Sequence, residues 1–327
     1  MAAGQPGYEA CTGCSLCLLA CPVWRATRDL RLTPHGRARA LQCGATAGEL
    51  AASIDTCTLC GACEPACPEN IGLVAMMIDL RAELARHTPE RVAQVRARMN
   101  GGIGATPVGP AAATRLVPDR ALHAHPALLE RVVGLLGGNG KLAVAQDDGA
   151  DIAMALEAGA AIPDARLACF LAPLRGAGRL IVGDGMLIRA LRGWLPGVRI
   201  ESLGVAASSA AAVRDKLRAS DLYVIEPRAY HADQERLVKY YDALRASLGC
   251  GMNLDLQRLA IPTTATTATT AGCLPAALGR SNVDVRDQTR WILEGREFSR
   301  IVVEDLNDIA AFTAVTDKPV VHLAQLI

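Results

Sequence analysis

The chain has 327 residues, a formal net charge of +1 and 12 cysteines. This length is enough for two domains that each bury an ordinary core. The 34 lysines and arginines nearly balance the 33 acidic residues, and no basic run alternates with aromatic residues, so the sequence lacks the charge pattern of a nucleic-acid binder. No apolar stretch reaches the roughly 18 uncharged residues that a membrane span needs, and residues 1–10 lack a signal-peptide pattern. We therefore expect a cytoplasmic protein with no transmembrane segment of its own.

Most of the cysteines are concentrated near the N-terminus. Nine of the 12 lie within the first 67 residues, which in a reducing compartment indicates metal or redox chemistry and not disulfides. Eight of the nine form two runs with one spacing, Cys-x2-Cys-x2-Cys-x3-Cys-Pro. The runs are Cys11, Cys14, Cys17 and Cys21 with Pro22, and Cys57, Cys60, Cys63 and Cys67 with Pro68. This spacing is typical of bacterial ferredoxins with two [4Fe–4S] clusters, so we expect two such clusters as cofactors.

The spacing also predicts which cysteines share a cluster. In two-cluster ferredoxins, three cysteines of a run bind one cluster and the fourth binds the other. The expected metal ligands are Cys11, Cys14, Cys17 and Cys67 for cluster 1, and Cys57, Cys60, Cys63 and Cys21 for cluster 2. The small residues Gly13, Ser15, Gly61 and Ala62 would let backbone N–H groups approach the sulfur atoms.

Complete cysteine ligation limits the expected chemistry. A cluster whose irons all have thiolate ligands has no open position for substrate, so we expect outer-sphere electron transfer and assign no catalytic residue. Two four-cysteine zinc sites are the alternative, although zinc modules usually combine two separated Cys-x2-Cys pairs. Cys43, between the runs, is expected to be a buried apolar side chain.

The remainder of the chain has a different sequence pattern. Leu73–His87 is predicted to be a helix, and the Gly-, Pro- and Ala-rich stretch Asn100–Pro118 reads as a linker. From Lys141 onward, short apolar runs alternate with helix-like stretches, which indicates an α/β architecture. The expected strands are Leu142–Ala145, Leu180–Val182, Val198–Ile200, Leu222–Ile225, Ile301–Val303 and Val320–Leu323.

A faint internal repeat runs through this second part. Arg179–Asp184 aligns with Arg300–Asp305, and Pro196–Leu203 aligns with Pro319–Leu326. The sequence thus indicates two related halves, residues 141–205 and 221–327. The alternative is that any two strand–helix units share an apolar run and an early acidic residue.

The cysteine runs, and the segment Thr33–Arg37 followed by Ala40 and Leu41, resemble a known family. It comprises the iron–sulfur subunits of glycolate, lactate and anaerobic glycerol-3-phosphate dehydrogenases and the C and D subunits of heterodisulfide reductase. The resemblance implies a helical two-cluster ferredoxin-like domain, as in fumarate reductase, followed by an α/β domain of two pseudo-repeats. In the family each repeat normally carries a Cys-Cys-Gly motif.

The second domain departs from that family. In Tyr223–His231, Arg228 stands where the family has a cysteine, and Gly272-Cys273-Leu274 is the only trace of a Cys-Cys-Gly motif. With only Cys169, Cys250 and Cys273 in this domain, we expect no third cluster. The Gly183–Gly185 turn and the tyrosines and cations of 230–241 are weaker candidates for a phosphate site and a partner surface. A plain strand–helix turn and an amphipathic helix face are the alternatives.

The expected architecture is α+β overall. It comprises a two-cluster domain over residues 1–95, a linker and connecting helix over 96–140, and a duplicated, degenerate Cys-Cys-Gly-like α/β domain over 141–327. The resemblance implies a non-catalytic electron-transfer subunit of an oxidoreductase complex. Its partners would be a flavoprotein dehydrogenase, a membrane quinone-reducing subunit, or both. The alternative is a heterodisulfide-reductase-like enzyme acting on a thiol, disulfide or small oxidant, with Cys250 or Cys273 as a redox-active thiol.

Overall fold

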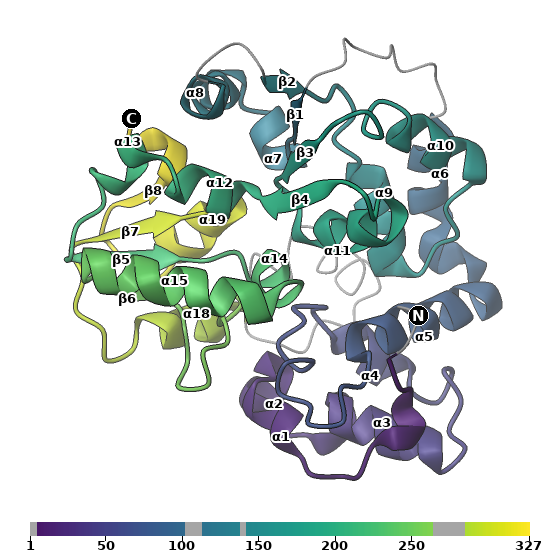
Figure 1. Ribbon diagram of the computed structural model, residues 1–327. Helices are drawn as coiled ribbons and strands as arrows, with labels where there is room; N and C mark the ends of the chain where they lie inside the picture. The colour runs from purple at the N-terminus through teal and green to yellow at the C-terminus, as the bar shows by residue number, and fades with distance from the viewer. Residues whose placement is uncertain (1–4, 102–112, 138–141, 264–284) are drawn as a thin grey trace.

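The computed structural model describes residues 5–101, 113–137, 142–263 and 285–327. The chain mixes helices with two small parallel sheets, as expected for an α+β protein. Residues 5–101 form a helical module in purple and blue. Most of it lies at the bottom of Figure 1, and its last helix, α6 (Ala93–Gly101), lies at the upper right beside α9 (Ala150–Ala158) and α10 (Asp164–Leu171). The two sheets and their helices lie above most of this module, the first in teal and the second in green and yellow.

Residues 5–101 form short helices and contain no strand. The α-helices are α1 (Leu16–Leu19), α2 (Pro22–Thr27), α3 (Pro34–Gln42), α4 (Ala51–Thr56), α5 (Leu73–His87) and α6 (Ala93–Gly101); the 3-10 helices are η1 (Tyr8–Ala10), η2 (Leu30–Leu32) and η3 (Pro89–Val92). Pro22 and Pro34 occupy the first position of α2 and α3, where a missing N–H costs nothing. The predicted helix Leu73–His87 matches the bounds of α5.

The segment between the cysteine runs is held by buried polar contacts. The Thr33 hydroxyl caps α3 by accepting from the Gly36 amide at 3.2 Å. Arg37 is 1% exposed and donates to the carbonyl oxygens of Leu32 at 3.0 Å and Ser53 at 2.7 Å. A buried guanidinium that satisfies backbone carbonyls fixes η2, α3 and α4 relative to one another.

The first sheet has the parallel strand order β2-β1-β3-β4. Its strands are β1 (Thr114–Val117), β2 (Leu142–Val144), β3 (Arg179–Val182) and β4 (Arg199–Ser202). Its helices are α7 (Arg120–His123), α8 (Pro126–Leu136), α9 (Ala150–Ala158), α10 (Asp164–Leu171), α11 (Gly185–Trp194) and α12 (Leu203–Ser208). The next helix, α13 (Ala211–Arg214), packs its Val213 into the core of the second sheet. Strand β1 falls within the stretch expected to be a linker, so the first half begins earlier in the chain than the sequence indicates.

The second sheet repeats the same order as β6-β5-β7-β8, again parallel. Its strands are β5 (Asp221–Val224), β6 (Gly251–Met252), β7 (Arg300–Val303) and β8 (Val320–His322). Its helices are α14 (Pro227–His231), α15 (Gln234–Leu248), α18 (Val285–Leu293), α19 (Asn307–Thr313) and η4 (Leu323–Gln325). The segments aligned in the sequence are β3 with β7 and β4 with β8, and they occupy equivalent positions in the two sheets.

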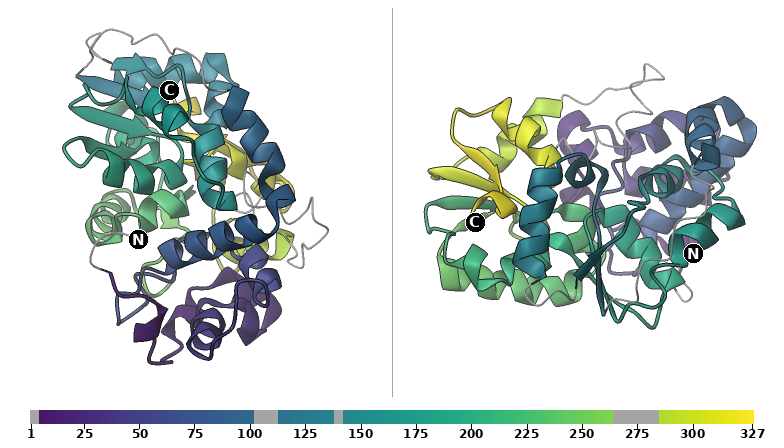
Figure 2. Two further views of the ribbon diagram at one scale, coloured as in Figure 1. Left: turned by 90° about the vertical axis from the view of Figure 1, so that its right-hand side faces the viewer. Right: turned by 90° about the horizontal axis from the view of Figure 1, so that it is seen from above.

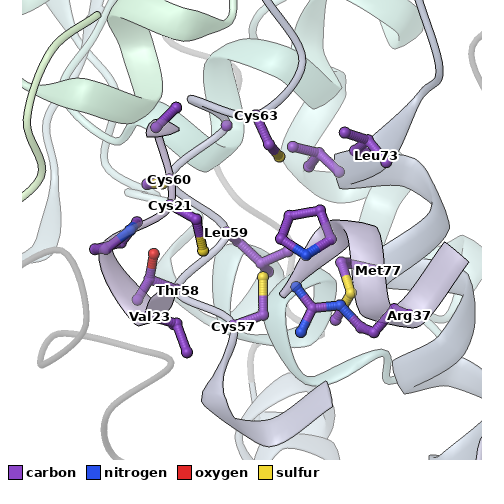
Figure 3. A pocket seen from close by; sticks show the side chains of 15 residues that line it. Cys21, Val23, Arg37, Cys57, Thr58, Leu59, Cys60, Cys63, Leu73 and Met77 are labelled. Atoms are coloured by element: carbon purple, nitrogen blue, oxygen red, sulfur yellow. The ribbon is translucent and has the colours of Figure 1, made fainter. Parts of the chain in front are cut away.

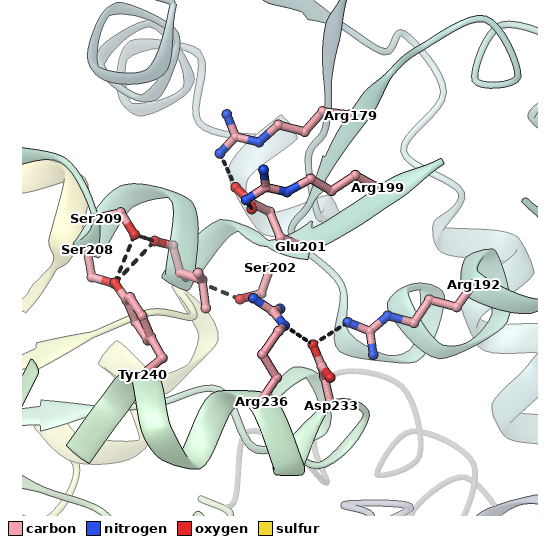
Figure 4. Close-up of polar contacts among 11 residues, drawn as sticks. Arg179, Arg192, Arg199, Glu201, Ser202, Ser208, Ser209, Asp233, Arg236 and Tyr240 are labelled. Carbon is pink, nitrogen blue, oxygen red and sulfur yellow. Dashed lines mark hydrogen bonds and ion pairs between the residues drawn. The ribbon is translucent and has the colours of Figure 1, made fainter. Parts of the chain in front are cut away.

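Polar contacts join the two halves (Figure 4). Arg192 of α11 donates to the Ala232 carbonyl oxygen and to the Asp233 carboxylate, both at 2.8 Å. The Tyr240 hydroxyl on α15 lies 2.8 Å from the Ser208 hydroxyl at the end of α12. The halves therefore meet through side chains of helices, while each sheet keeps its own strands.

The helical module packs against both halves (Figures 1 and 2). One continuous core contains Leu80 of α5 together with Ile152 of α9 and Leu187 of α11. On the other side, the Arg25 guanidinium lies 3.2 Å from the centroid of the Trp291 ring in α18. This shared core brings the second cysteine run against the α/β part of the chain.

Candidate iron–sulfur site

The two cysteine runs fold into loops of the same backbone shape. In each run, the residues on either side of the second cysteine have positive φ: Gly13 (83°) and Ser15 (67°), and Leu59 (52°) and Gly61 (79°). A left-handed conformation is costly for Ser15 and Leu59, so the surrounding structure must impose it. Left-handed residues in tight turns direct successive N–H groups into a concavity that suits an anionic group.

One group of cysteines, the outer cysteine set, contains Cys11, Cys14, Cys17 and Cys67. The pKa of Cys17 is raised to about 11, mainly by burial and also by the nearby thiols of Cys67, Cys11 and Cys14. The backbone amide of His35 donates to Cys17 and opposes this shift. Cys14 is exposed. The fourth cysteine of the second run thus lies beside the first three cysteines of the first run.

The other group, the inner cysteine set, contains Cys21, Cys57, Cys60 and Cys63. Burial raises the pKa of Cys63 well above its ordinary value, and Cys60, Glu64, Cys57 and Cys21 raise it in decreasing order. These four cysteines line one cavity, with Cys21, Cys57 and Cys63 pointing toward a shared space (Figure 3). Cys21 and Cys60 are buried, so the inner set is more enclosed than the outer set.

Backbone amides also reach the sulfur atoms of the inner set. The amide of Trp24 donates to Cys21 and the amide of Ala62 donates to Cys60, and both bonds favour the thiolate form. Burial raises the pKa of Cys21 to about 12. Thiolates this buried and this close to one another need compensating positive charge, which a bound metal group supplies.

The donor set fits iron–sulfur clusters. All eight predicted cysteines are brought into two groups of four, and thiolate is the ligand that [4Fe–4S] clusters use. Among the described residues, no three His, Cys, Asp or Glu side chains are placed to hold a single metal ion.

Arg228 connects the second half to the loop that carries Cys57, Cys60 and Cys63, called here the inner loop. It is 7% exposed and donates to the Thr58 carbonyl oxygen at 2.8 Å. It also forms an ion pair with Glu157 of α9. Glu157 in turn accepts, through its backbone oxygen, a 2.6 Å bond from Arg81 of α5, and Arg81 donates to the Cys57 carbonyl oxygen at 2.5 Å. The sequence identified Arg228 only as the replacement of a cysteine.

His231 makes the second contact to the inner loop. Its Nε2 accepts from the Ala260 amide at 3.2 Å, so the ring proton is on Nδ1, which donates to the Cys60 carbonyl oxygen at 2.8 Å. Burial lowers the pKa of His231 to about 4, which keeps the ring neutral at ordinary pH. A Cβ at Gly61 would lie 3.1 Å from the His231 Cβ, so the two segments approach closely.

The carboxyl ends of the strands border a second cavity between the two halves. Asp119, Asp184, Glu226 and Asp305 line it together with Arg228. Asp184 caps α11 by accepting from the amides of Met186 and Leu187. The Gly183–Gly185 turn is therefore occupied by its own carboxylate, as in an ordinary strand–helix turn.

Other predicted residues have structural roles. Tyr223 and Tyr241 donate to the buried Glu304 carboxylate at 2.8 and 2.6 Å. Burial raises the pKa of Cys250 to about 11, the opposite of what a reactive thiol needs. Cys43 is exposed, contrary to the expectation of burial, because it follows the last residue of α3 in a turn. Cys273 lies outside the described residues.

Comparison with known proteins supports the metal assignment. A family model described as a 4Fe-4S dicluster domain matches residues 7–71, which contain all eight cysteines of the two runs. The chain is an iron–sulfur protein. The matched segment accounts for about a fifth of the 327 residues and indicates binding of 4Fe-4S clusters there. No curated protein and no solved structure gives a significant match. No helix in the described ranges has the length and apolar character to cross a membrane.

Proposed function

We propose that this chain is an electron-transfer subunit that relays single electrons through two [4Fe–4S] clusters, one held by the outer cysteine set and the other by the inner set. The supporting observation is the crossing of the two runs, in which Cys67 lies with the first run and Cys21 with the second. Such clusters supply one-electron redox chemistry at a potential that depends on hydrogen bonds to sulfur and on solvent exposure. The donor would be a flavoprotein dehydrogenase, and the acceptor a quinone-linked membrane subunit or another carrier.

The surroundings of the two cysteine sets favour a directional relay. The outer set has the exposed Cys14, while the inner set is enclosed by α5, α9 and the second half through Arg81, Arg228 and His231. Burial disfavours added negative charge, whereas N–H donors to sulfur favour it. The two sites therefore have different potentials, and electrons reach the inner site by way of the outer one.

The α/β part would act as a scaffold in this proposal. Its two sheets of equal strand order are similar to the duplicated domain of the resembled family, with Arg228 where that family has a cysteine. The ion pair from Arg228 to Glu157 and its bond to Thr58 give the position a structural role in place of metal binding. In this proposal, the α/β part of the chain therefore holds the inner loop in place and determines which proteins bind.

The experiment compares reduction by a protein with reduction by a small molecule. The anaerobic holoprotein should contain about eight irons, accept two electrons in titration, and oxidise no organic substrate without a flavoprotein. In a Cys14→Ala variant that retains the inner site, a reduced flavodoxin should reduce that site at least about tenfold more slowly, while dithionite should reduce it fully. Substrate oxidation by the chain alone, or unchanged reduction by flavodoxin, would refute the relay.

A further inference from the structure

We propose that the surface around the outer cysteine set, called here the docking face, binds an electron-transfer protein that has an apolar centre and an acidic rim. The docking face consists of Cys14, Leu16, Leu19, Arg28 and Arg39. This inference rests on the proposed electron relay and specifies its protein partner.

Two leucines provide the apolar centre. Leu16 is 44% exposed and Leu19 is 62% exposed. Both belong to α1, and residues three apart lie on one face of a helix. They lie two and five positions after the exposed Cys14. A pair of large apolar side chains held in water beside a metal-binding loop is typical of a surface that another protein covers.

Exposed arginines lie in the same segment of the chain as this centre. Residues 11–43 contain five arginines and one acidic residue, a net charge of +4 (5 − 1), whereas the whole chain carries +1; Arg37 is buried, and Arg28, Arg31 and Arg39 are the exposed arginines of this segment. The remaining residues therefore sum to −3 (1 − 4). The single acid, Asp29, forms a 2.7 Å ion pair with Arg31. Arg28 and Arg39 are exposed, and a Cβ at Gly13 would lie 4.0 Å from the Arg39 Cδ. Arg39 is thus beside the cysteine loop, Arg28 follows the end of the neighbouring helix α2, and charge complementarity calls for an acidic partner.

The opposite side of the cysteine module offers no comparable approach. The inner loop is covered by Arg228 and His231, which bond to Thr58 and Cys60, and Cys60 itself is 7% exposed. Among the described residues, the outer cysteine set is therefore the more open of the two to the protein that delivers electrons. A second copy of the chain would bring two positively charged faces together, which argues against self-association there.

Binding can be measured separately from electron transfer. The probe is an acidic flavodoxin, titrated into the anaerobic holoprotein by calorimetry at low and at physiological salt. Leu19→Ser should weaken binding about fivefold, because it removes part of the apolar centre. The double variant Arg28→Glu and Arg39→Glu should weaken it at least about tenfold, mainly at low salt. Leu256→Ser is the matched control, because Leu256 is fully exposed in the second half, and it should leave binding unchanged.

Each outcome decides between the claims. Unchanged binding in the docking-face variants, or equal weakening in Leu256→Ser, would overturn the docking face. The same variants are also titrated with anionic lipid vesicles. If they lose binding to the vesicles while their binding to flavodoxin is unchanged, the face is a membrane surface and the proposed docking face is overturned. Dithionite reduction of every variant separates this inference from the relay. If dithionite cannot reduce the holoprotein, the relay is refuted. If dithionite reduces it normally and every variant binds flavodoxin as the unmodified protein does, only the docking face is refuted.

Discussion

Replacing Arg228 with methionine tests how the α/β part holds the cysteine module. The Arg228 side chain joins three segments that are distant in sequence: its own helix α14, Thr58 in the inner loop, and Glu157 in α9. Arg228 is 7% exposed and Glu157 is 2% exposed. Arg228→Met keeps much of the side-chain volume but removes the charge and the donor to the Thr58 carbonyl oxygen.

These contacts set the range expected for the loss in the free energy of unfolding of Arg228→Met. Removing one partner of a buried ion pair costs about 3–5 kcal/mol, because the remaining charge loses its compensation. This range already includes much of the cost of leaving a buried carbonyl without its donor, about 1–3 kcal/mol, so the two are not added. Removing both charges, in Arg228→Met with Glu157→Gln, should be less destabilising than Arg228→Met alone, by about 1–3 kcal/mol.

The assay is urea unfolding of the anaerobic holoprotein, followed by circular dichroism and by visible absorbance in the same samples. Absorbance should fall at lower urea in Arg228→Met, because the inner loop loses a contact that the outer loop never has. Arg175→Met is the control, since Arg175 is exposed and its replacement should change the free energy of unfolding by less than about 0.5 kcal/mol. A loss below about 1 kcal/mol for Arg228→Met, or a double variant as unstable as the single one, would refute the reasoning.

Two further predictions concern protons and backbone shape. Burial raises the pKa of Glu226 from 4.5 to about 8, so the folded chain keeps a proton that the unfolded chain has released. Stability from this group is lost as pH rises, by about 1.5 kcal/mol between pH 6.5 and pH 8; Glu226→Gln should flatten the stability profile there, and an unchanged slope would contradict the assignment. Gly61→Ala should cost about 1–2 kcal/mol, because φ is 79° and the new Cβ would lie 3.1 Å from the His231 Cβ. The control Gly193→Ala, in a helix with open space around it, should be neutral or stabilising in the same thermal melts.

The arrangement of the cysteines within each run can be predicted from the local sequence. The x2 and x3 intervals restrict how far apart sulfur atoms of one run can lie, and the repeated proline starts or redirects the chain after each run. The spacing alone predicts that Cys67 shares a cluster with Cys17; the two thiols influence each other in the structure, and the ligand assignment stays a prediction. The helix Leu73–His87 was equally predictable, because its apolar periodicity is long and uninterrupted.

Long-range contacts were not predictable in this way. Arg228 and Thr58 are 170 positions apart, and His231 and Cys60 are 171 apart. No local pattern distinguishes such contacts from an ordinary charged helix face. Strand β1, Thr114–Val117, was missed for a different reason: it has four residues beside a Gly-, Pro- and Ala-rich stretch. Its stability comes from pairing with β2 and β3, which lie later in the chain.

The iron content of two double variants tests the crossed ligand assignment most directly. If Cys67 serves the same cluster as Cys14, then Cys14→Ala with Cys67→Ala damages one cluster and should leave about four irons per chain. Cys60→Ala with Cys67→Ala damages both clusters and should leave almost none. The reverse pattern, with irons retained in the second variant and lost in the first, would show that each run binds its own cluster and would contradict the account.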